Sequence, residues 1–120
     1  MRLWVVEDDD DFLRALRWRL KRTAPHVEVI QIDSPDEALR RMVAGDLPDA
    51  LISDLMFRGC ASGEDVILAA RRRDVPSLLC SDLMESFGPA GMIRKVRFLE
   101  SPWRFMCDKS VPSLEASACA

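Results

Sequence analysis

Residues 3–8 (LWVVED) and residues 50–54 (ALISD) each end a run of apolar side chains with acidic ones. Two later runs have the same form: residues 76–81 (PSLLCS) end in a hydroxyl group, and residues 105–109 (FMCDK) end in an ammonium group. Short apolar runs of this kind are typical of strands buried in a parallel sheet. The carboxyl ends of such strands meet at one edge, where open α/β folds bind ligands. The sequence therefore predicts an α/β fold with a polar site at that edge.

Helical segments separate the apolar runs, so that strand and helix alternate five times along the chain. This alternation predicts a parallel sheet with helices on both faces, in a doubly wound arrangement. The 120 residues are the size of one domain, residues 1–120, which buries about two thirds of its unfolded surface. We expect strands at residues 2–6, 27–32, 50–53, 75–80 and 104–108, and helices between residues 10 and 23, between 34 and 45, at 64–73 and at 90–99.

The helix limits follow from residues that favour helix ends. Asp10 or Asp11 can cap the first helix, and Trp18 lies off its apolar stripe, where we expect it to be partly exposed. Residues 34–37 (SPDE) form a capping-box pattern with proline at the first helical position. Gly45 is a natural stop for the helix that they begin.

Composition excludes several classes of function. A formal net charge of −3 argues against a general nucleic-acid binder. The basic residues of the first and third helical segments are expected to form solvated helix faces and C-termini. Residues 3–6 are too short an apolar run for a signal peptide, and no stretch approaches the roughly 20 apolar residues needed to span a membrane.

The four cysteines and the single histidine, His26, show no zinc-binding spacing. Cys80 and Cys107 fall inside predicted core strands, where a free thiol behaves as a small apolar side chain. This pattern is typical of a protein of the reducing cytosol.

The polar residues at the predicted sheet edge suit phosphoryl chemistry with Mg²⁺. This ion prefers oxygen ligands and typically binds one or two carboxylates together with phosphate and water, and Glu7 and Asp8 can supply them. Asp54, at the end of the next acid-terminated run, can serve as both metal ligand and nucleophile. Lys109 supplies a cation for the phosphoryl oxygens, and the Ser81 hydroxyl can hydrogen-bond one of them. The simpler alternative treats the acids as helix caps or turn residues, Ser81 as a loop hydroxyl and Lys109 as a surface residue.

This set of residues, in this order, resembles the receiver domain of two-component response regulators over nearly the whole chain. Three more features agree with the family. Pro76 lies five residues before Ser81, Gly63 follows Asp54 by nine residues, and residues 109–110 form a Lys-Ser pair where Lys-Pro is usual. The resemblance implies a flavodoxin-like (βα)5 fold with a five-stranded parallel sheet of strand order 2-1-3-4-5.

The resemblance also implies a role for each residue of the site. In receivers the residue at the position of Asp54 accepts a phosphoryl group from a histidine kinase or phosphotransfer protein, with Mg²⁺ bound. The backbone carbonyl of Met56 would complete the metal shell formed with Glu7, Asp8 and Asp54. We expect signalling by contact with a downstream protein target in the cytoplasm, as a monomer or weak dimer. Enzymatic turnover, direct nucleic-acid binding and membrane association are not expected.

Several positions depart from the family's pattern. Arg58 stands where proline is usual, Asp82 follows Ser81 where a small residue is usual, and Met106 occupies the place of the aromatic switch residue. The segment between Ser81 and Lys109 is longer than usual, and eleven residues follow Lys109. We therefore expect an atypical fourth-helix region, a short last helix and a smaller conformational response to phosphorylation.

Three other functions compete with the leading one. Arg58, Asp82 and Met106 favour a degenerate receiver that acts as a phosphorylation-independent interaction module. A magnesium-dependent phosphatase of the haloacid-dehalogenase type needs a second acid two residues after its nucleophile, where this chain has Met56. A role in nucleic-acid binding has only the short basic segment at residues 94–97 (RKVR) in its favour.

Overall fold

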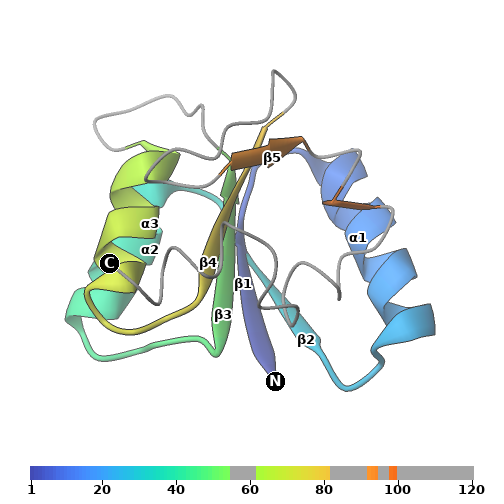
Figure 1. Ribbon diagram of the computed structural model, residues 1–120, viewed down its shortest axis with the longest axis horizontal. Coiled ribbons are helices and arrows are strands. Elements are labelled where there is room, and N and C mark those ends of the chain that lie inside the picture. The colour runs from blue at the N-terminus through green and yellow to red at the C-terminus, as the bar shows by residue number, and fades with distance from the viewer. Residues whose placement is uncertain (55–61, 82–91, 95–97, 100–120) are drawn as a thin grey trace.

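A five-stranded parallel sheet with helices on both faces forms the protein (Figure 1). The computed structural model describes residues 1–54, 62–81, 92–94 and 98–99, with the backbone alone for Ser81 and residues 92–94. The strand order is β2-β1-β3-β4-β5, which confirms the predicted doubly wound fold. The elements are β1 (Arg2–Val6), α1 (Asp10–Thr23), β2 (Glu28–Ile32), α2 (Pro35–Val43), β3 (Ala50–Asp54), α3 (Gly63–Arg71), β4 (Ser77–Ser81) and β5 (Met92–Arg94).

The centre of the sheet is the pairing of β1 with β3. Val6 lies opposite Ser53 on one side and opposite Ile32 of β2 on the other. The ladder continues one step past β1, because the Glu7 N–H donates to the Ile32 carbonyl at 3.1 Å. The carboxyl ends of β1 and β3 therefore meet side by side.

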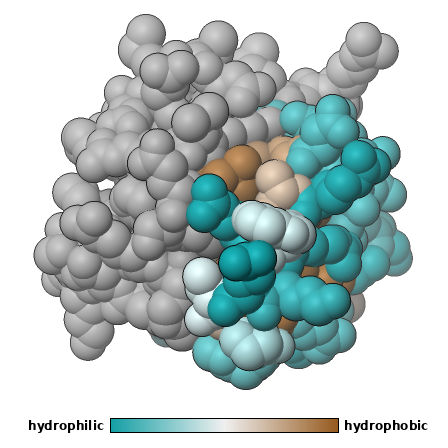
Figure 2. All heavy atoms as spheres, turned by 90° about the vertical axis from the view of Figure 1, so that its right-hand side faces the viewer, coloured by the Kyte–Doolittle hydropathy of each residue, from teal (hydrophilic) through white to brown (hydrophobic). Residues whose placement is uncertain are grey.

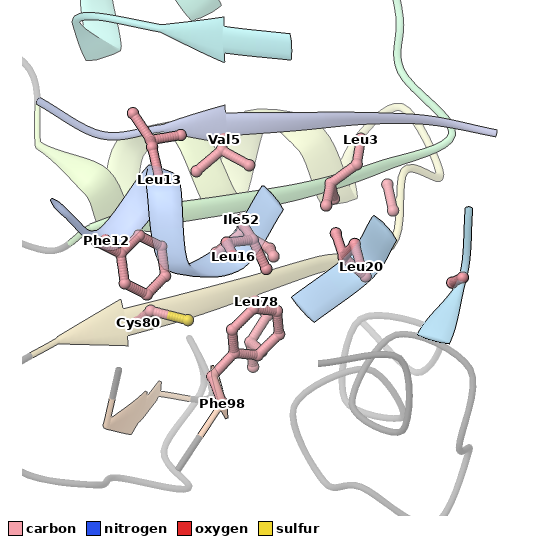
Figure 3. Packing of buried hydrophobic residues seen from close by; sticks show 12 residues of the cluster. Leu3, Val5, Phe12, Leu13, Leu16, Leu20, Ile52, Leu78, Cys80 and Phe98 are labelled. Atoms are coloured by element: carbon pink, nitrogen blue, oxygen red, sulfur yellow. The ribbon is translucent and has the colours of Figure 1, made fainter. Parts of the chain in front are cut away.

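Helix α1 covers one face of the sheet. Its buried residues Phe12, Leu13, Leu16 and Leu20 share one side of the helix, as helical spacing requires, and pack against Leu3, Val5 and Ile52 of the strands (Figure 3). Helices α2 and α3 cover the other face (Figure 1). Trp4 and Val6 of β1 point to that side and pack with residues of both helices. Successive residues of β1 thus alternate between two separate cores.

The last described strand differs from the prediction. The sequence predicts a helix over residues 90–99, but Met92–Arg94 forms β5, parallel to β4, with Cys80 opposite Ile93. The exposed backbone of β4 offers a row of unpaired hydrogen-bonding groups, and pairing with it outweighs a weak local preference for helix. The predicted strand at residues 104–108 lies outside the described residues.

Phe98 is a core residue that the predicted basic helix left unassigned. Its side chain is buried among the residues under α1, with its ring centroid 6.5 Å from that of Phe12 (Figure 3). An aromatic side chain carries a large apolar area, and its burial stabilises the fold more than most single contacts. Phe98 and Leu99 thereby lie against the α1 face of the sheet.

Helix α1 begins at a different cap from the one predicted. Asp9, and neither Asp10 nor Asp11, is the N-cap, since its Oδ1 accepts from the backbone N–H groups of Asp11 at 3.0 Å and Phe12 at 3.4 Å. Only residues 7–9 connect β1 to α1, so the helix begins at once and Asp10 and Asp11 fall in its first turn. Acidic residues in the first turn also stabilise a helix, because their negative charge interacts favourably with the positive end of the helix dipole.

The ends of the other helices show one partly confirmed and one overlooked pattern. At the start of α2 the Ser34 hydroxyl accepts from Glu37 N–H at 3.2 Å, which is one half of the predicted capping box, while the Glu37 carboxylate accepts from Arg40 and Arg41 instead. Gly45 ends that segment with φ of +90°. Helix α3 begins with a full capping box that the sequence interpretation missed, in which Ser62 N–H donates to Asp65 Oδ2 at 2.8 Å and Asp65 N–H donates to Ser62 Oγ at 3.3 Å.

The outer surface of α1 is strongly polar (Figure 2). Its basic residues are exposed, as predicted, and so is Trp18, with 56% of its surface accessible. The guanidinium carbons of Arg22 and Arg19 lie 4.8 and 5.7 Å from the Trp18 ring centroid, within cation–π range. None of the described helices is long and apolar enough to cross a membrane.

On α2, Glu37 accepts hydrogen bonds from the side chains of Arg40 and Arg41. These hydrogen bonds, that of Arg40 first, hold the pKa of Glu37 below its ordinary value. A carboxyl group with a lowered pKa in the folded state stabilises the fold above its unfolded pKa. This contribution disappears as the pH falls through the folded pKa.

We therefore expect Glu37→Gln to lower the urea midpoint at neutral pH, and the difference from wild type to shrink in acid. The measurement is urea unfolding across a pH series. Glu28→Gln is the control, since it removes the same charge from an exposed position on β2 and leaves the α2 ion pairs intact. A difference that stays constant from neutral to acidic pH would contradict this role of Glu37.

Candidate functional site

Three carboxylates meet at the carboxyl edge of the sheet. Oxygen atoms of Glu7, Asp8 and Asp54 all lie within 4.8 Å of one another. Glu7 and Asp8 follow β1, and Asp54 ends β3, so the side-by-side pairing of these two strands brings the three groups together. The sequence-predicted acids therefore converge, although their binding of a metal ion stays a prediction.

Glu7 is the fixed member of this acidic cluster. Only 1% of its surface is exposed, and a buried carboxylate is costly unless hydrogen bonds compensate it. Its Oε1 accepts from the backbone N–H groups of Asp8 and Asp9, both at 3.1 Å. Gln31 Nε2 donates to the Glu7 carbonyl at 3.3 Å, which ties the same residue to β2. The carboxylate is thus held in place by the turn between β1 and α1.

The five acidic residues at positions 7–11 have different structural roles. Asp9 caps α1, and Asp10 and Asp11 lie exposed in its first turn. Asp8 is exposed and Asp54 is half-buried, so both can meet a ligand from solution. A string of like charges is therefore divided between a helix N-terminus and an oxygen-rich cluster.

The backbone at Asp54 is held by two neighbours. Ser53 Oγ donates a hydrogen bond to the Asp54 carbonyl at 2.9 Å. Gly63, in the first turn of α3, lies so close that a Cβ there would stand 1.7 Å from the Asp54 carbonyl oxygen. Only glycine fits this contact, which explains the glycine nine residues after Asp54.

The remaining predicted site residues are less completely described. Ser81 ends β4 at the same edge, one residue beyond Cys80, which lies opposite Asp54. Met56 and Lys109 lie outside the described residues, and so do Arg58, Asp82 and Met106. The structure therefore brings together the three acids and places the Ser81 backbone near them.

A shallow groove of about 490 Å³ lies elsewhere, along α1. Its lining includes Trp18, Arg19 and Leu99, but none of the three clustered carboxylates. The acidic cluster reaches solvent at the edge of the sheet through Asp8, which is exposed, and Asp54, which is half-buried. A group of carboxylates suits a small cation better than an apolar molecule.

The acidic cluster has the donor set that Mg²⁺ prefers. All three groups offer carboxylate oxygens, and magnesium sites in proteins commonly combine one or two carboxylates with water and phosphate oxygens. Glu7 has one oxygen committed to backbone N–H groups, whereas Asp8 and Asp54 are open to solvent. The residues present fit a hydrated divalent ion.

Asp54→Asn removes one of three mutually repelling charges. We expect it to raise the free energy of unfolding of the metal-free protein by roughly 1 kcal/mol at low salt, and added NaCl to reduce this gain through screening. Urea unfolding in the presence of a chelator measures both effects. Asp33→Asn, at an exposed acid after β2, is the control, with a change within about 0.5 kcal/mol. A loss of stability in Asp54→Asn would show that the three charges are already compensated.

Solved structures with this architecture share little sequence with the chain. The N-terminal domain of a response regulator/sensory box/GGDEF protein from Carboxydothermus hydrogenoformans matches with a TM-score of 0.74 and 14% identity, over 100% of both chains. The phosphorylated cyanobacterial phytochrome response regulator RcpA matches with a TM-score of 0.70 and 16% identity, over 90% of this chain and 94% of that one.

A third similar structure is the response regulator TrrA from Thermotoga maritima in complex with Mg²⁺-BeF. It matches with a TM-score of 0.57 and 20% identity, over 89% of this chain and 81% of that one. No protein-family model and no curated protein sequence matches the chain. The solved structures establish that the chain has the receiver-domain fold of response regulators.

Proposed function

We propose that this chain is a phosphoacceptor receiver domain of a two-component system, with Asp54 as the acceptor. The observation that carries the proposal is the convergence of Glu7, Asp8 and Asp54 within 4.8 Å at the carboxyl edge of a receiver fold. A fold alone does not define a function, whereas a set of chemical groups at its ligand-binding edge supports one. One related structure was solved in phosphorylated form and another with Mg²⁺-BeF, which agrees with this assignment.

Glu7, Asp8 and Asp54 would hold Mg²⁺, together with the Met56 carbonyl. The bound ion would neutralise charge on the phosphoryl oxygens. Glu7 keeps its position without a ligand because two backbone N–H groups hold its Oε1. Asp54 reaches the open edge from β3, where a donor protein can approach it.

The transfer itself is a displacement at phosphorus. A carboxylate oxygen of Asp54 forms a bond to the phosphorus of a phosphohistidine on the donor, and the bond from phosphorus to the imidazole nitrogen breaks. The imidazole keeps the electron pair, and Asp54 becomes an acyl phosphate. Lys109 would place its ammonium group against the phosphoryl oxygens, and the Ser81 hydroxyl would donate a hydrogen bond to one of them.

The role proposed for the phosphorylated chain is protein contact in the cytoplasm. The phosphoryl donor is a histidine kinase or a phosphotransfer protein, and the signal passes to a downstream protein target. Neither direct nucleic-acid binding nor enzymatic turnover is part of the proposal, and the expected state is a monomer or weak dimer. Met106, in the place of a switch aromatic, has more rotatable bonds and no ring, which favours a small response.

A second candidate is a degenerate receiver that binds its partner without phosphorylation. Asp82 favours it, because a second carboxylate next to Ser81 would repel a phosphoryl group. Arg58 and Met106 favour it as departures from the receiver pattern. The two candidates differ in one outcome, namely whether the chain takes up a phosphoryl group.

Phosphorylation is the decisive test. We expect wild type, incubated with Mg²⁺ and a small phosphodonor, to gain the mass of one phosphoryl group, and Asp54→Ala and Lys109→Ala to gain little or none. Ser81→Ala should still gain a phosphoryl group. Its conformational response to phosphorylation should be weaker, since the variant loses one hydrogen bond to the phosphoryl oxygens. Intact mass spectrometry gives the readout. Asp10→Ala, at an exposed acid outside the cluster, is the matched control and should resemble wild type.

The result against the proposal is clear in the same experiment. Equal phosphorylation of wild type and Asp54→Ala would overturn Asp54 as the acceptor. A wild-type chain that takes up nothing, even with a histidine kinase as donor, would favour the degenerate receiver.

Magnesium affinity gives an independent test. Asp54→Asn is expected to weaken Mg²⁺ binding by about tenfold or more, since even residues that only support a metal ligand cost 10–100-fold when changed. Titration followed by fluorescence of buried Trp4 measures it, in a Trp18→Phe, Trp103→Phe background that leaves Trp4 as the one remaining tryptophan. Isothermal titration calorimetry is the cross-check. Unchanged affinity in Asp54→Asn would exclude Asp54 from the metal site.

A further inference from the structure

Ser53 is a polar residue in an apolar place. It lies in β3 at the centre of the sheet, between Val6 of β1 and Leu79 of β4, with none of its surface exposed. Burial of a hydroxyl group costs free energy unless it makes a hydrogen bond. The hydrogen bond that Ser53 makes is to the carbonyl oxygen of Asp54, at 2.9 Å.

The same carbonyl group is confined from a second side. A Cβ at Gly63 would lie 1.7 Å from the Asp54 oxygen, 2.7 Å from the Asp54 carbonyl carbon and 2.9 Å from Ser53 Oγ. Gly63, the Ser53 hydroxyl and the Asp54 carbonyl thus form one tight contact on the α3 side of the sheet. Successive side chains of a strand point to opposite faces of the sheet, so the Asp54 side chain points to the α1 face and the Ser53 side chain to the α3 face.

We propose that Ser53 is a positioning residue that sets the geometry of the acceptor Asp54 through its backbone carbonyl. A hydrogen bond to this carbonyl, backed by Gly63, restricts the ψ angle of Asp54. The rotamers open to a side chain depend on φ and ψ, so the contact also restricts the direction of the carboxylate. This inference rests on the proposed phosphoacceptor function and deepens it.

The chain contains its own matched control for this idea. Ser77 of β4 is also a serine with none of its surface exposed, in a neighbouring strand of the same sheet. Among the residues that the structure describes, its hydroxyl has no hydrogen-bond partner. Ser53→Ala and Ser77→Ala therefore delete the same atom from equally buried sites, but only the first removes a contact to Asp54.

The experiment compares both variants with wild type in three measurements: Mg²⁺ affinity, rate of phosphorylation by a small phosphodonor, and free energy of unfolding. We expect Ser53→Ala to slow phosphorylation and weaken Mg²⁺ binding, each by about two- to tenfold, the range that one hydrogen bond of ordinary strength supports. Ser77→Ala should keep both within about twofold, and its stability should be equal or higher, because it removes a buried hydroxyl without a described partner.

Ser53→Cys separates positioning from packing. A thiol fills similar space but is a weak donor, so this variant should share the defect of Ser53→Ala. A wild-type rate in Ser53→Cys, together with a slow Ser53→Ala, would show that Ser53 only fills space and would overturn the proposal. Wild-type rates and affinities in Ser53→Ala would overturn it as well.

The outcome for wild type distinguishes this inference from the function on which it rests. If wild type neither binds Mg²⁺ nor accepts a phosphoryl group, the phosphoacceptor function fails and the positioning role fails with it. If wild type does both and Ser53→Ala equals it, only the positioning role fails. Equal defects in Ser53→Ala and Ser77→Ala would assign the effect to lost stability of the sheet and reject the role of Ser53.

Discussion

The parallel pairing of β1 with β3 is the interaction on which the rest of the structure depends. It places Glu7 and Asp8 next to Asp54, and it does so against electrostatic repulsion among three carboxylates. The opposing force comes from the apolar run in front of these acids, since residues 3–6 are fully buried. Each such side chain contributes about 1.5–3 kcal/mol on burial, and the four act together against the repulsion of the carboxylates. The hydrophobic sheet centre therefore holds together a site that would otherwise separate.

Much of this arrangement could be predicted from the sequence because it depends on local patterns. The apolar runs of β1, β3 and β4 fixed the strands, and the acids behind the first two indicated the site. The cap at Ser34 and the exposure of Trp18 followed from helix rules that need no tertiary information. Because the predicted strand order makes β1 and β3 parallel neighbours, it also predicted that the acids at their carboxyl ends lie close together.

Other features depend on partners that are distant in sequence or on geometry, and these were missed. Met92–Arg94 is a strand because β4 offers it an edge, and Phe98 is buried because the α1 face has room for it. Asp9 caps α1 because the turn from β1 is short, which a string of five similar acids cannot reveal. The contact of Ser53 with Asp54 became visible only once Gly63 was placed against the end of β3. The capping box at residues 62–65, by contrast, has a Ser-x-x-Asp spacing that the sequence itself offers.

The contact between Gly63 and the Asp54 carbonyl also has a mechanical consequence. It joins backbone to backbone, with no side chain that could change its rotamer to absorb a displacement. Any shift of the Asp54 peptide group toward α3 must push the first turn of that helix. The capping box at residues 62–65 stiffens that turn. A displacement of the Asp54 peptide group would therefore be passed on to helix α3 instead of being absorbed by the rotation of a side chain.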